Sequence, residues 1–85
     1  MSGAIHPADP NRQWHIDIIS KAVKLHDPEL ELVNIEDLTQ QIVAGSIFRG
    51  VLKAKKHDVT AKYTFDIWKK PGPDDEIEIN SFTKQ

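Results

Sequence analysis

Hydrophobic residues recur at intervals of three and four between residues 11 and 26, and this spacing predicts one amphipathic helix. Charged residues fall between them, as they do on the solvent side of a helix that packs on a core. Asp9-Pro10 has the residue types of a helix start, and Asp27-Pro28 predicts where the helix ends. The apolar positions of this helix are Trp14, Ile18, Ile19, Ala22, Val23 and Leu25.

Beyond Pro28, apolar and polar residues alternate instead, and this pattern predicts β-strands. The clearest run is 60–68, and shorter runs cover 47–56 and 76–82. Turn residues at His57-Asp58 and in the segment 71–75 separate these strands. The residues expected on the buried side are Phe48, Gly50, Leu52 and Ala54, then Ala61, Tyr63, Phe65 and Ile67, and finally Ile77 and Ile79.

The segment 29–42 has a less regular pattern. Its apolar residues change parity between Leu32 and Val33, so a strand here requires a β-bulge at that point. A helix that buries Leu38 and Ile42 is a competing interpretation. The bulged strand is favoured, because the later strands need a partner between the helix and the next hairpin.

These elements predict an α+β fold in which one N-terminal helix packs across a four-stranded antiparallel sheet. A chain of 85 residues suits a single domain spanning 1–85. Residues 1–9 contain Gly3 and Pro7 and show no periodicity, so we expect them to form a flexible, extended arm ahead of the helix.

Composition narrows the classes of function. Eleven Lys and Arg against 13 Asp and Glu leave a net charge of −2, which is too balanced to favour a nucleic-acid partner or an anionic membrane. The lysines of 53–56 beside the aromatic residues of 63–68 resemble a nucleic-acid platform, but Tyr63 and Phe65 share the parity of the core.

The chain contains no cysteine, which excludes a disulfide scaffold and a cysteine nucleophile and fits a cytoplasmic location. No apolar run approaches the ~20 residues of a membrane-spanning helix. Residues 1–10 also lack the pattern of a secretory signal, so we expect no membrane partner.

The spacing of candidate residues does not match any catalytic or metal-binding motif that we considered. Gly45 and Gly50 match the glycines of a phosphate-binding loop, but Val51-Leu52 stands where Lys followed by Ser or Thr is required. The four histidines never fall at i and i+4, and no serine lies in a nucleophile-elbow motif. The acidic run at 74–76 is typical of a solvated turn. We therefore expect no enzyme activity, no metal and no cofactor.

The segment 40–46, Gln-Gln-Ile-Val-Ala-Gly-Ser, connects two predicted strands and is uncharged and apolar at its centre. A hairpin turn in solvent is ordinarily polar, with Asn-Gly or Asp-Gly at its tip. If Ile42, Val43 and Ala44 form such a tip, they indicate a surface that a partner covers. The alternative is that these residues continue a buried strand.

Gln41 to Gly45 fits the Gln-x-Val-x-Gly signature of the cystatin family, the inhibitors of papain-like cysteine proteases, and the chain resembles that family on both sides of the motif. Residues 30–35 look like the strand that enters this loop in plant cystatins, and 68–71 resemble the end of a later strand and the second hairpin. The start, Met1–Ala4, is similar to that of a stefin, the cytosolic branch without disulfides.

The resemblance implies a reversible, tight-binding inhibitor that occludes the protease cleft with a wedge of three parts. The N-terminal arm would lie along the non-primed subsites, the first hairpin beside the catalytic cysteine, and the second hairpin over the primed side. The protease-binding residues that it implies are Gly3, Ala4, Ile5, Gln41, Ile42, Val43, Ala44, Gly45, Pro71 and Gly72.

Two departures from the family pattern keep an alternative open. Gly72 takes the place of a tryptophan that follows proline in many cystatins, and the arm ahead of Gly3 is short. If the wedge lacks its aromatic anchor, the chain would be a non-inhibitory protein-binding module on the same fold. Strain at Val43 would also favour a domain-swapped dimer, in which two chains exchange the helix and first strand, and we expect the monomer to be the active form.

Overall fold

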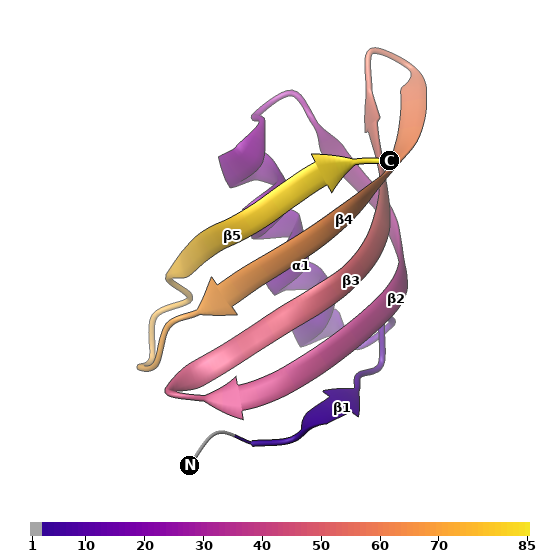
Figure 1. Cartoon of the computed structure of the whole chain (residues 1–85). Helices are drawn as coiled ribbons and strands as arrows, with labels where there is room; N and C mark the ends of the chain where they lie inside the picture. Colours follow the sequence, from indigo (N-terminus) through magenta and orange to yellow (C-terminus); the bar gives the residue numbers. More distant parts are fainter. Residues whose placement is uncertain (1–2) are drawn as a thin grey trace.

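The computed structural model describes residues 3–85 and contains one α-helix packed on a five-stranded antiparallel sheet. The sheet order is β1-β2-β3-β4-β5, so each strand pairs with the next strand along the chain (Figure 1). The fold class is α+β, and within residues 3–85 no helix is long and apolar enough to cross a membrane. The elements are β1 (Ile5–Pro7), α1 (Gln13–His26), β2 (Glu31–Val43), β3 (Gly45–Lys56), β4 (Val59–Lys69) and β5 (Ile77–Lys84).

The sheet has five strands where the sequence predicted four. Ile5–Pro7 lies inside the expected flexible arm, yet it forms β1 and pairs with Thr39–Gln41 of β2. This pairing satisfies backbone groups along the outer edge of β2 that would otherwise face only water. Three exposed residues carry no apolar alternation, so the pattern gave no sign of this strand. Residues 1 and 2, the outer end of the expected arm, lie outside the described residues.

The helix follows the predicted apolar spacing and ends at the predicted place, but it starts later than expected. Asp9 does not cap α1: its carboxylate accepts a hydrogen bond from the amide of Asn11 at 2.9 Å, which closes a turn ahead of the helix. The helix therefore begins at Gln13. Leu25, which was expected on the buried stripe, is 57% exposed, whereas Ile18, Ile19, Ala22 and Val23 are buried.

β2 is the bulged strand that the change of parity predicts. Its register against β3 shifts between Leu32 and Asn34, as expected, and shifts again between Ile35 and Asp37. The two irregularities bend β2 around the helix, so the competing helical interpretation of this segment is wrong.

The hydrophobic core lies between α1 and one face of the sheet, and the other face is turned to solvent (Figure 1). Alternate residues of the middle strands supply the sheet side of this core, as their period of two predicts. Phe48, Leu52 and Ile67 are fully buried, and His15 of α1 packs its ring against Phe48 at 5.4 Å between centroids.

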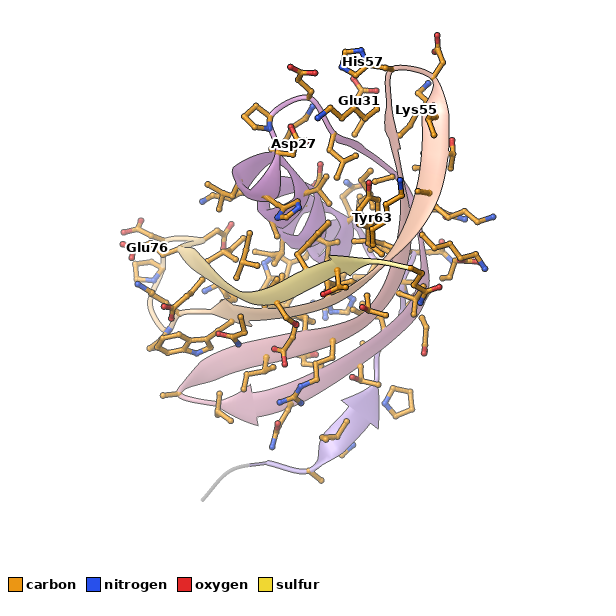
Figure 2. All side chains as sticks on the ribbon, turned by 45° about the horizontal axis from the view of Figure 1, so that its top comes forward. Asp27, Glu31, Lys55, His57, Tyr63 and Glu76 are labelled. Atoms are coloured by element: carbon orange, nitrogen blue, oxygen red, sulfur yellow. The ribbon has the colours of Figure 1, made fainter. Side chains whose placement is uncertain are left out.

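An ion pair fastens the end of the helix to the sheet. Figure 2 shows Asp27 near His57 of the β3–β4 turn, at an end of the molecule away from Glu76. The Asp27 carboxylate accepts hydrogen bonds from the ammonium of Lys56 at 2.8 Å and from the amide of Glu29 at 3.0 Å. These bonds, the one from Lys56 foremost, hold the pKa of Asp27 below its ordinary value of 3.8.

Gly50 provides a first test of the bulged fold. A Cβ atom at this position would lie 1.8 Å from the carbonyl oxygen of Asp37, where the second bulge brings β2 close to β3. We expect Gly50→Ala to lower the free energy of unfolding by about 3 kcal/mol, because the backbone of β2 must move. Urea denaturation measures the change, with Lys53→Ala on the outer face as the control. Equal, small effects of both substitutions would contradict the close approach of the two strands.

Asp27 provides a test that depends on pH. Because the pKa of Asp27 is lowered in the folded state, its contribution to stability is present above pH 3.8 and is lost as the pH falls through the folded-state value. We expect Asp27→Asn to unfold more easily than the wild-type chain at pH 7, with the difference in unfolding midpoint vanishing near pH 2. Asp74→Asn, at an exposed loop carboxylate, should show no such convergence. A difference that stays constant with pH would argue against the ion pair.

Candidate functional site

Three segments that are far apart in the sequence meet at one end of the sheet: the N-terminal arm, the β2–β3 hairpin and the β4–β5 loop (Figure 1). They contain all ten protease-binding residues that the family resemblance implies. We call this surface the hairpin edge and define it as residues 3–5, 41–45 and 68–72. Helix α1 does not contribute to it (Figure 1).

The arm is held against β2 by its backbone. The amide of Gly3 donates a hydrogen bond to the carbonyl oxygen of Ile42 at 2.7 Å, and Ile5 stands opposite Gln41 in the sheet register. Ala4 lies between these two anchor points and is exposed. Although its backbone is paired, Ile5 leaves 57% of its surface in solvent, so an apolar side chain projects from an ordered strand.

The first hairpin turns within a single residue. Ile42 pairs with Ser46 and Val43 with Gly45, which leaves Ala44 alone at the tip. Gly45 makes this turn possible, because its φ of 84° lies in the left-handed region that residues with a Cβ rarely adopt. Ile42 is 59% exposed, so the segment forms an exposed apolar tip, and the interpretation as a continuous buried strand is wrong.

The second loop, between β4 and β5, is organised by Lys69. Its ammonium donates hydrogen bonds to the carbonyl oxygens of Lys70 at 3.2 Å and Gly72 at 3.1 Å, and it lies 3.9 Å from the Asp75 carboxylate. The Lys69 side chain is only 12% exposed, since it lies under the loop that it holds. Pro71 and Gly72 are exposed at the turn.

The two loops touch through their backbones. A Cβ atom on Gly45 would lie 2.1 Å from the carbonyl oxygen of Lys69 and 2.9 Å from the nitrogen of Pro71, so only glycine allows this approach. The indole of Trp68 adds a hydrogen bond from Nε1 to the carbonyl oxygen of Ala44 at 2.7 Å. The tip of one hairpin and the base of the other therefore form one continuous surface.

A shallow apolar hollow adjoins this contact on the outer face of the sheet. It is lined by Val43, Ala44, Ile47, Trp68 and Asn80. Ile47 and Trp68 are direct partners in the register of β3 and β4, which places both side chains on the same face. The hairpin edge thus offers apolar surface on its outer side as well as at its tip.

The hairpin edge is mostly apolar. Its polar side chains are the amide of Gln41 and the ammonium groups of Lys69 and Lys70. Within residues 3–85, no three His, Asp or Glu side chains gather in a way that could hold a metal ion. Sequence reasoning missed the roles of Trp68 and Lys69, because both act on backbone atoms of neighbouring loops and such contacts leave no pattern in the sequence.

Comparisons with protein-family models, with curated proteins and with solved structures found no match to this chain.

Gly45 and Gly72 form a matched pair for testing the contact between the loops. Both have positive φ, at 84° and 115°, but a Cβ on Gly72 meets no atom within 4 Å. Gly72→Ala should therefore cost about 1 kcal/mol of backbone strain, whereas Gly45→Ala should cost about 3 kcal/mol because the loops must also separate. In a Trp14→Phe background, the fluorescence of Trp68 should shift to the red for Gly45→Ala alone. Identical shifts for both variants would contradict the contact.

Proposed function

We propose that this chain is a reversible, tight-binding inhibitor of papain-like cysteine proteases, and that it acts by occluding the active-site cleft. The observation that carries the proposal is the hairpin edge, where the arm, the first hairpin and the second loop lie together at one end of the sheet (Figure 1). The Gln-x-Val-x-Gly signature lies at the centre of this surface. A fold with one helix across an antiparallel sheet is compatible with a cystatin.

The chemistry of the three parts supports occlusion rather than catalysis. Val43, Ala44 and Gly45 are small enough for a narrow cleft, and exposed Ile42 and Ile5 bring apolar area to the contact. The hydrogen-bonded backbones of the arm and tip are already ordered, so binding loses little conformational entropy. Inhibition leaves the chain intact, since a single-residue turn presents no extended peptide bond for attack.

The proposed partner is a papain-like protease alone, with no nucleic acid, membrane or cofactor in the mechanism. A chain without cysteine folds without an oxidising compartment, which supports a cytoplasmic inhibitor. We take the monomer as the inhibitory form. Opening the turn at Ala44 would join β2 and β3 into one long strand and allow a swapped dimer, and that exchange would remove the tip from the hairpin edge.

One observation favours the alternative of a non-inhibitory protein-binding module. The open space around Gly72 leaves the second loop without an aromatic side chain to fill a pocket on a partner. Trp68 does not replace such an anchor, because its indole is hydrogen-bonded back to Ala44. This module would bind a shallower partner surface through the same hairpin edge.

Titration of papain with this chain tests the proposal. We expect inhibition with a nanomolar constant, and recovery of the intact chain by mass spectrometry after dissociation. Val43→Asp, combined with Gln41→Ala, should weaken inhibition at least ~100-fold, because a buried interface carboxylate loses its hydration without a partner.

The matched control is Val59→Asp, which introduces the same charge at an exposed valine beside the β3–β4 turn. Its inhibition constant should equal that of the wild-type chain. Failure of the wild-type monomer to inhibit papain at micromolar concentration would favour the non-inhibitory module, and equal inhibition by all variants would exclude the hairpin edge as the binding surface.

A further inference from the structure

A row of polar side chains crosses the outer face of the sheet next to the hairpin edge, one from each of four strands. Arg49 of β3 donates from Nε to the Asp66 carboxylate at 3.0 Å and from Nη1 to the side-chain oxygen of Gln41 at 3.1 Å. The Gln41 amide in turn donates to the carbonyl oxygen of Gly3 at 3.2 Å. On the far side, Asn80 of β5 donates to the other oxygen of Asp66 at 3.1 Å.

The sheet register explains why these groups meet. Arg49 and Asp66 are direct partners, while Arg49 reaches Gln41 along the diagonal, because the partner of Gln41 is Ile47. Asn80 is the extra residue of a bulge in β5, so its side chain is free to turn toward Asp66. A planar guanidinium presents donors on two sides and can bridge two strands at once.

Arg49 also determines which way the Gln41 amide points. A guanidinium only donates hydrogen bonds, so the Gln41 oxygen must face Arg49 and the amide nitrogen must face away from it. That nitrogen then lies 3.2 Å from the Gly3 carbonyl oxygen. Since the Gly3 amide also donates to Ile42, both polar backbone groups of Gly3 are bound by β2.

We infer that Arg49 is a positioning residue that orients Gln41 and, through it, holds the N-terminal arm beside the first hairpin. Asp66 and Asn80 keep the guanidinium in place. At its inner end the arm is held by β1 and by Ala8, whose amide donates to the carbonyl oxygen of Leu38 at 3.0 Å. The side chains of β1 are all exposed, so the order of residues 3–5 at the outer end depends mainly on backbone pairing and on the Gly3 anchor. The consequence for protease binding rests on the proposed function: an arm already in place binds with less loss of entropy.

Arg49→Met tests this inference on the free protein. Methionine keeps an unbranched stem of similar length and removes the guanidinium. We expect the heteronuclear NOE values of Gly3, Ala4 and Ile5 to fall, while the melting temperature stays within a few degrees of the wild type. The control is Lys62→Met, which removes a cation from β4 on the same outer face of the sheet. Lys62 pairs there with Glu36 at 3.2 Å.

Arg49→Lys separates positioning from charge. A single ammonium can keep the ion pair with Asp66 but cannot also fix the Gln41 amide, so we expect the arm of this variant to be as mobile as in Arg49→Met. This milder variant also decides the question if Arg49→Met does not fold. Unchanged arm order in the folded Arg49 variants, or equal loosening by Lys62→Met, would overturn the inference.

Inhibition of papain by the same variants provides the second measurement. Loss of one hydrogen-bonded anchor should weaken inhibition about three- to tenfold, mainly through faster dissociation, with Lys62→Met unchanged. If the wild-type chain does not inhibit papain, the proposed function fails while the NMR measurement still decides the role of Arg49. If the wild-type chain inhibits papain strongly but the NOE values of the arm do not change in the Arg49 variants, only the positioning role is wrong.

Discussion

A helix of 14 residues covers one face of strands that reach 13 residues, and this difference in length shapes the molecule. The helix spans about 21 Å, whereas an extended strand of that size spans about 43 Å. The buried apolar residues of β2 and β3 end near Leu38 and Phe48 on this side, and β2, β3 and β4 continue beyond them to the hairpin edge. Residues past that point cannot be stabilised by burial against α1, so other contacts must hold the hairpin edge together.

Those contacts are made largely to backbone atoms. Gly3 bonds to Ile42, Gly45 lies against the carbonyl of Lys69, and Trp68 and Lys69 donate to carbonyl oxygens of the neighbouring loops. The apolar side chains of Ile5 and Ile42 take no part in these contacts and stay exposed. This arrangement differs from the opposite end of the sheet, where the Asp27–Lys56 ion pair fastens charged side chains to each other.

Sequence patterns predicted the parts of this structure that depend on burial. The spacing of Ile18, Ile19, Ala22 and Val23 located the helix, and the change of parity at Leu32-Val33 located the first bulge. β1 was missed because its three residues are exposed and are held by backbone pairing, which leaves no hydrophobic pattern in the sequence. The start of α1 was misplaced because an aspartate can either cap a helix or close a turn, and Asp9 closes a turn.

The candidate site divides in the same way. The motif from Gln41 to Gly45 and the turn at Pro71-Gly72 could be found by inspection, yet their contact could not, since it depends on a carbonyl of Lys69 facing a missing Cβ. The role of Arg49 could not be predicted for a related reason: its hydrogen-bond partners, Gln41 and Asp66, come from two other strands, and they meet only when the register is known. Residues that shape a surface through backbone atoms or diagonal contacts leave the hydrophobic pattern unchanged. Substitution at such positions can therefore alter binding while the pattern that specifies the fold stays the same.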